Sequence, residues 1–137
     1  MIKETITYNG YDGVEYTEDF YFNLTTAEIL KLESSVKGGL SEGLKKMIAE
    51  EDASGVIATI EELVQRSYGK KIGKAFVKRA EDLEEFMYTE AYSNLLMKLL
   101  SDENAAGKFI KGTVPADLAA KIAEEEAKQA QENSENS

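Results

Sequence analysis

The sequence contains no cysteine, no histidine and no tryptophan, and it has a single proline among its 137 residues. Without cysteine, disulfide scaffolds and thiol nucleophiles are excluded. Without histidine as well, the usual zinc sites and serine–histidine catalysis are excluded too. No apolar run approaches the roughly 18 residues of a membrane span, and no signal-peptide pattern follows Met1. We therefore expect a soluble, intracellular protein.

Basic residues are scarce. The chain has 16 lysines and arginines against 26 acidic residues, a net charge of −10. Such a charge repels phosphate backbones and anionic membranes, so we expect neither nucleic acid nor a membrane among the partners. The densest basic stretch, at 70–79, is followed at once by an acidic run at 81–85. Charge runs of this kind are usually solvated, and we interpret both as partly self-paired surface.

The remaining composition, 42% hydrophobic and 31% charged, is that of an ordinary globular protein. A chain of this length forms one domain and buries roughly two-thirds of its unfolded surface. We assign that single folded domain to residues 1–115.

Two segments near the N-terminus, 2–8 and 14–22, alternate polar with β-branched or aromatic residues. This pattern predicts a β-hairpin over 2–22. A loop of three or five residues keeps the two apolar faces together, because a shift by one residue exchanges the faces of a strand. The register that we expect has three marker pairs: Ile6 with Tyr16, Tyr8 with Val14, and Glu4 with Glu18. The last pair, two like charges, is the weak point of this register.

From residue 25 onward the apolar period changes from two to 3.6, which predicts helices. A capping-box pattern opens the first helix at Thr25 and Glu28. Helical periodicity continues in four further segments, at 41–50, 56–68, 81–100 and 103–112. The pattern leaves open whether 81–100 holds one long helix or two. It predicts a loop at 69–73, and it leaves 75–77 open between strand and loop.

These patterns predict an α+β fold that is predominantly helical. The β-hairpin over 2–22 packs on a bundle of about five helices over 25–112. After Pro115 the character changes, since residues 116–137 hold six acidic and two basic side chains. Leu118 and Ile122 are the only large apolar residues of this segment. We expect an acidic C-terminal tail, helix-prone to disordered.

Carboxylate doublets are the first candidates for acid–base or metal chemistry. They lie at 50–52, 61–62 and 84–85. Adjacent helical residues point about 100° apart, so these carboxylates do not converge on one point. Neither a calcium loop nor a phosphate-binding glycine motif is present. We predict a non-enzymatic protein with no catalytic residue, no bound metal and no cofactor.

Four segments carry a resemblance to a known family: residues 1–8, 18–25, 89–96 and 109–115. They resemble the small tail assembly chaperones of long-tailed bacteriophages, over most of residues 1–115. The resemblance implies a non-enzymatic protein of the host cytoplasm that is absent from the mature virion. It also implies binding to the tape-measure protein and help in tail-tube polymerisation, with the major tail-tube protein and self-association as further candidate contacts.

The physical properties of the chain are compatible with this role, because a holdase needs helical grooves and enough charge to stay soluble. We expect an apolar groove on the folded part, with Leu118 and Ile122 as additional partner-binding residues. Two alternatives stay open: a structural tail or adaptor protein, and an acidic nucleic-acid mimic that acts as an inhibitor.

Truncation after Pro115 is expected to leave thermal stability nearly unchanged. Two buried aliphatic side chains return about 1.5–3 kcal/mol each, whereas ordering costs roughly 1 kcal/mol or more for every residue. Thermal unfolding followed by circular dichroism compares the two lengths. A clear fall in the midpoint after truncation would place the tail inside the folded domain.

Overall fold

The computed structural model describes residues 1–35 and 39–114, so the predicted tail at 116–137 lies outside the described residues. Four strands form one sheet in the order in which they follow along the chain: β1 Ile2–Asn9, β2 Glu15–Phe22, β3 Tyr68–Ile72 and β4 Ala75–Val77. The described part of the chain also contains six helices: α1 Thr26–Ser35, α2 Leu40–Ala49, α3 Ala53–Ser67, α4 Ala80–Met87, α5 Glu90–Ser101 and α6 Glu103–Thr113.

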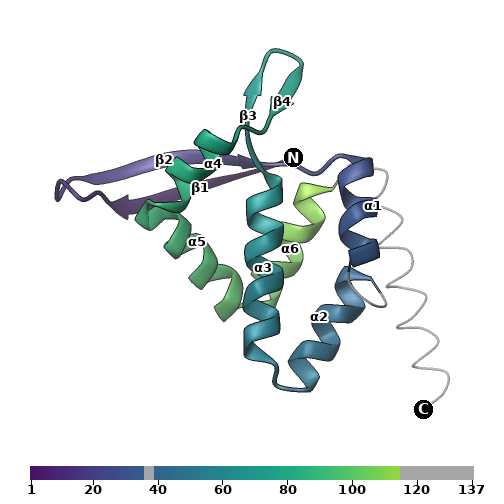
Figure 1. Ribbon diagram of the computed structural model, residues 1–137. Coiled ribbons are helices and arrows are strands. Elements are labelled where there is room, and N and C mark those ends of the chain that lie inside the picture. The colour runs from purple at the N-terminus through teal and green to yellow at the C-terminus, as the bar shows by residue number, and fades with distance from the viewer. Residues whose placement is uncertain (36–38, 115–137) are drawn as a thin grey trace.

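The long hairpin of β1 and β2 lies across one end of the helices, with α3, α5 and α6 on the same side of it (Figure 1). The short hairpin of β3 and β4 projects to the other side (Figure 1). The predicted mixture of an N-terminal strand pair with a larger helical part is confirmed. The described chain has six helices where about five were expected, because the segment 81–100 holds two of them. It also has a second hairpin, which was not predicted.

The second hairpin corrects the prediction of a loop at 69–73. β3 begins at Tyr68, and Ile72 pairs with Ala75, so Gly73 and Lys74 form a two-residue turn. Gly73 has a φ of 60°, which costs glycine little and matches the positive φ required at the first position of a type II′ hairpin turn. The open question at 75–77 is thereby answered as a strand.

The register of the first hairpin also differs from the expected one. The parity is right, since a five-residue loop separates β1 from β2 and both apolar faces lie on the same side. The pairing is displaced by two residues, so that three pairs replace those expected: Ile6 with Glu18, Tyr8 with Tyr16, and Glu4 with Phe20.

The loop itself explains this displacement. The backbone N–H of Gly10 donates to the carbonyl of Val14 at 2.8 Å, which extends the ladder into the loop. Asp12 accepts from the N–H of Val14 at 3.0 Å, and Gly13 takes a positive φ of 80°. The observed pairing also separates Glu4 from Glu18 and brings Glu4 to Lys98 of α5 at 3.0 Å, which removes the like-charge pair.

The first helix begins as its capping box predicts. The N–H of Thr25 donates to the Glu28 carboxylate at 3.0 Å, and the N–H of Glu28 donates to the Thr25 hydroxyl at 3.3 Å. The segment 81–100 holds two helices, because α4 ends at Met87 and Thr89 occupies the N-cap position of α5. The Thr89 hydroxyl donates to the carbonyl of Phe86 at 2.7 Å, at the end of α4.

An aromatic cluster joins the sheet to the helices. Phe86 of α4 lies at its centre, with ring-centroid distances of 4.5 Å to Tyr68, 4.9 Å to Phe20 and 5.9 Å to Phe22. Phe22 in turn contacts Phe109 of α6 edge-on at 5.1 Å. Such offset and edge-to-face pairs add stability beyond the burial of area. The cluster therefore connects β2, β3, α4 and α6 in one core.

Leu63→Ala is expected to lower the free energy of unfolding by about 2–5 kcal/mol, as other large-to-small core substitutions do. Leu63 is 1% exposed in the middle of α3, so the substitution leaves a cavity. Ile57→Ala on the same helix is the control, because Ile57 is 41% exposed and should lose much less. Urea denaturation measures both variants, and equal losses would contradict the burial described here.

Candidate partner-binding groove

An apolar groove lies where the end of α2 meets the start of α3. Its volume is about 410 Å³. It is lined by residues from both helices, from the turn between them and from the end of α5: Met47, Ile48, Glu51, Asp52, Ala53, Val56, Ile57 and Leu100. This volume falls within the range of roughly 300–1,000 Å³ that is usual for ligand pockets.

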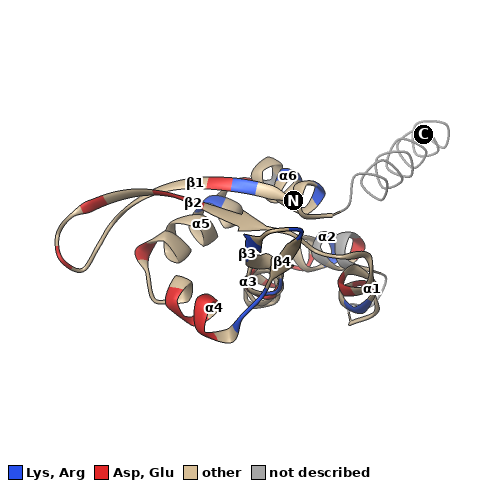
Figure 2. Cartoon of the chain, turned by 90° about the horizontal axis from the view of Figure 1, so that it is seen from above, with Lys and Arg blue, Asp and Glu red and all other residues tan. Residues whose placement is uncertain are grey.

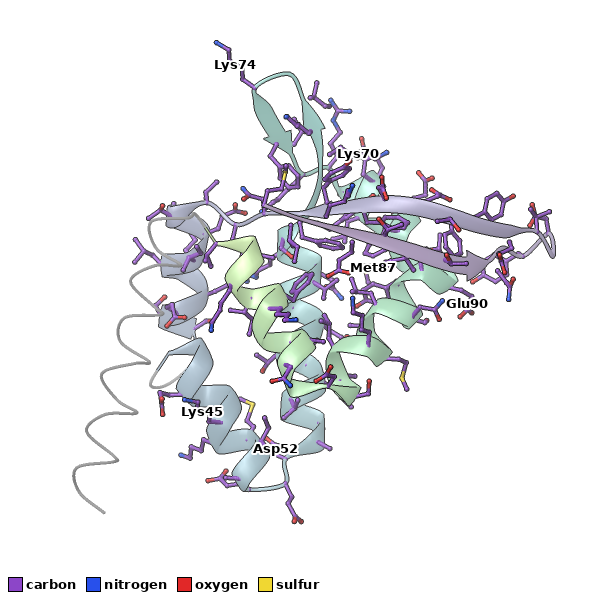
Figure 3. All side chains as sticks on the ribbon, turned by 180° about the vertical axis from the view of Figure 1, so that it is seen from behind. Lys45, Asp52, Lys70, Lys74, Met87 and Glu90 are labelled. Atoms are coloured by element: carbon purple, nitrogen blue, oxygen red, sulfur yellow. The ribbon has the colours of Figure 1, made fainter. Side chains whose placement is uncertain are left out.

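The turn between the helices gives the groove its shape. Glu51 takes a positive φ of 57°, which reverses the chain after α2. Asp52 is the N-cap of α3, and its side chain accepts from the N–H of Gly55 at 3.0 Å. Its backbone N–H donates back to the carbonyl of Met47 at 2.8 Å. Figure 3 shows Asp52 at this corner, at the end of the molecule away from the projecting hairpin that carries Lys74.

The groove exposes large aliphatic side chains. Ile48 is 46% exposed and Ile57 is 41% exposed. Single exposed apolar residues are ordinary, but exposed apolar side chains that share one groove are typical of an interaction site.

The sequence predicted an apolar groove on the folded part of the chain but did not identify the residues that line it. The apolar stripes of 41–50 and 56–68 suggest that Ile48 and Ile57 are buried, and the structure shows that this interpretation is wrong for both. The stripe residues toward the middle of α3, Ile60 and Leu63, are buried as expected. The predicted partner-binding residues Leu118 and Ile122 lie outside the described residues.

Charge is distributed unevenly over the surface. Acidic residues gather on α4, and basic residues gather on β3 and just after β4 (Figure 2). Two ion pairs connect the basic stretch to acidic groups, Lys70 to Asp82 at 3.4 Å and Lys78 to Glu28 at 2.6 Å. The expectation of a partly self-paired surface is therefore confirmed. Exposed pairs of this kind contribute little to stability.

The family model for phage tail assembly chaperones matches residues 1–137, the whole chain. The chain belongs to this family. No curated protein and no solved structure gives a significant match to it. As a tail assembly chaperone it acts in the host cell while the phage is assembled, and its partners are among the phage tail proteins. Within the described residues, no helix combines the length and the hydropathy that a membrane crossing requires.

The ionisable groups of this tail assembly chaperone point to structural roles. Within residues 1–35 and 39–114, no three acidic side chains are grouped so that they could hold a metal ion. A hydrogen bond to Glu18, together with burial, raises the pKa of Tyr8 to about 12. Burial also raises the pKa of Tyr68 and of Tyr92. These hydroxyls stay protonated at neutral pH. Those of Tyr8 and Tyr92 form hydrogen bonds, the first to Glu18 and the second from the Gln65 side-chain amide at 3.0 Å.

The stability of the protein is expected to fall as the pH rises from 10 to about 12, because the pKa of Tyr8 is raised from 10.0 to about 12 in the folded state. A raised pKa favours the protonated form in the folded state, so the stabilisation is complete below the pKa of the unfolded chain and is lost above it. In Tyr8→Phe the free energy of unfolding should fall less between pH 10 and about 12, as measured by urea denaturation at a series of pH values.

Glu18→Gln is the second variant of this experiment. It removes the carboxylate that accepts from the Tyr8 hydroxyl and leaves the tyrosine in place. Its stability should fall less between pH 10 and about 12 than that of the wild type. An unchanged pH dependence in Tyr8→Phe would contradict the Tyr8–Glu18 contact.

Proposed function

We propose that this tail assembly chaperone holds an apolar helical segment of the tape-measure protein in the groove between α2, α3 and α5. By keeping that segment soluble, it assists the polymerisation of the tail tube around the tape measure. The observation that carries the proposal is the exposure of Ile48 and Ile57 in one groove, on a chain that belongs to the tail assembly chaperones.

The groove suits a helix better than an extended segment. Its walls are helices, and its lining is largely aliphatic, so most of its binding energy comes from burial of apolar area. A helix that lays apolar side chains at i, i+3, i+4 and i+7 into such a groove is a common recognition mode. Met47 at one wall adds adaptability, because an unbranched thioether side chain repacks around different partners.

Electrostatics favours a partner with basic residues beside its apolar stripe. Glu51 and Asp52 line the groove, and both are exposed. The net charge of −10 keeps a complex with an apolar partner in solution, since like-charged complexes repel one another. The role is non-enzymatic, and we place the protein in the host cytoplasm and outside the mature virion. Leu118 and Ile122 of the C-terminal segment extend the contact with the partner.

Ile48→Glu and Ile57→Glu should each lower the amount of soluble tape-measure protein on co-expression, because each places a charge in the apolar groove. Leu30→Glu is the matched control. Leu30 is 66% exposed on α1 and does not line the groove. Its substitution likewise replaces an exposed aliphatic side chain by glutamate, but outside the groove. The soluble fraction and a pull-down measure the outcome, and thermal unfolding checks that all three variants fold.

Two results would contradict the proposal at different levels. Groove variants that hold the partner as well as the wild type would move the binding site elsewhere. A wild-type chain that neither solubilises nor retains the tape-measure protein would mean that another tail protein is the partner. Mass spectrometry of purified virions tests the remaining point, and stoichiometric amounts of the chain in the particle would favour a structural tail or adaptor protein.

A further inference from the structure

The outer edge of β2 is open over most of its length. β1 pairs with β2 from Glu15 to Phe22, along the whole strand. β3 pairs only with its last two residues, Tyr21 and Phe22, and then turns away to form the short hairpin with β4. Within the described residues, the stretch 15–20 of β2 therefore has a neighbouring strand on one side only.

The hydrogen-bonding groups at this edge can be assigned from the ladder. The N–H of Gly10 donates to the carbonyl of Val14, so the even-numbered residues of β2 direct their backbone groups toward β1. The odd-numbered residues direct theirs to the other side, as the bond from the N–H of Asn23 to the carbonyl of Ser67 at 2.7 Å shows. Thr17 and Asp19 thus present backbone N–H and C=O groups that no described residue satisfies.

A cleft of about 590 Å³ lies beside this open edge. One wall is β2 from Glu18 to Tyr21, and the other is formed by the start of β3 and by α4. Rings of the aromatic cluster, among them Phe20, Tyr68 and Phe86, close its floor. The cleft lies where β3 would continue if it stayed paired with β2.

The rim of the cleft is mainly acidic. Glu18, Asp19 and Glu85 line it and are exposed. Figure 2 shows acidic residues on α4. Lys70 and Lys71 also line the cleft, and Lys70 is paired with Asp82 at 3.4 Å.

Glu18 lies on the same face of the sheet as the aromatic floor, where it accepts from the Tyr8 hydroxyl, and Glu85 is near the same hydroxyl. Asp19 lies on the opposite face, where it accepts from the Thr5 hydroxyl at 2.6 Å. A strand that enters this cleft turns one set of side chains toward the aromatic floor and the other set toward the face of Glu15 and Asp19.

We propose that the open edge of β2 binds an extended segment of a partner protein in which apolar residues alternate with lysine or arginine. The segment adds a strand to the sheet, takes its main-chain hydrogen bonds from Thr17 and Asp19, and gains specificity from the charges at the rim. A second copy of β2 is disfavoured at this place, because antiparallel pairing about Thr17 would set Glu15 of each copy opposite Asp19 of the other. This site is separate from the groove between α2 and α3.

The probe is a fluorescently labelled hexapeptide of alternating lysine and valine, titrated into the full-length protein and followed by anisotropy. Thr17→Pro should weaken its binding by about tenfold, because proline removes an N–H that donates to the peptide. The ladder to β1 is kept, since the N–H of Thr17 points away from it. Thr17→Ala is the matched control, which loses the side chain, keeps the N–H and should bind as the wild type does.

Charge is tested with a variant that leaves the backbone unchanged. A peptide of alternating glutamate and valine should bind the wild type at least about tenfold more weakly than the lysine peptide. Asp19→Lys should reduce this difference in affinity, whereas Glu50→Lys, with the same change of net charge just after α2, should leave it unchanged. Three results would overturn the proposal. The lysine peptide could bind Thr17→Pro as tightly as the wild type, or both peptides could bind the wild type with equal affinity. The wild type could also form a dimer that Thr17→Pro dissociates. None of these outcomes depends on the groove that is proposed for the tape-measure protein.

Discussion

The aromatic cluster around Phe86 is the interaction on which the rest of the structure depends. It holds α4 and the start of β3 against the apolar face of β2, with Tyr68 stacked on Phe86 at 4.5 Å. Because Tyr68 is both the C-cap of α3 and the first residue of β3, the same contact sets where the long helix ends and where the second hairpin leaves the sheet. The open edge of β2 follows from this departure. The cluster also ties α3 to the sheet, and α3 carries the groove at its far end.

The two candidate surfaces differ in the physics of recognition. The groove exposes aliphatic side chains and gains from the burial of area, so it tolerates many apolar helices. The edge of β2 offers directed main-chain groups at Thr17 and Asp19, and these select an extended backbone regardless of its side chains. A protein with both surfaces is suited to hold partners that are helical in one part and extended in another. The net charge of −10 disfavours association between copies of the chain.

Much of the fold could be predicted from local patterns. Period-two alternation located the first hairpin, and the capping box at Thr25 and Glu28 located the start of α1. The second hairpin was missed because only two paired segments of three to five residues form it. The two-residue turn at Gly73 was its one available signal. An apolar groove was expected, but its residues were not identified from the sequence. Ile57, for example, belongs to the same apolar stripe of α3 as Ile60 and Leu63, which are buried.

The sequence by itself determined the charge, the absence of thiol and imidazole chemistry, the helical segments, the two strands of the first hairpin, and the family. These are properties of composition or of neighbours along the chain. Tertiary structure alone decided the departure of β3 after Gly69 and the exposure of Ile48. Each of these depends on which distant residues meet, as when Phe86 takes its place against β2. A periodic pattern states that a face is apolar, but only packing decides whether another element covers it.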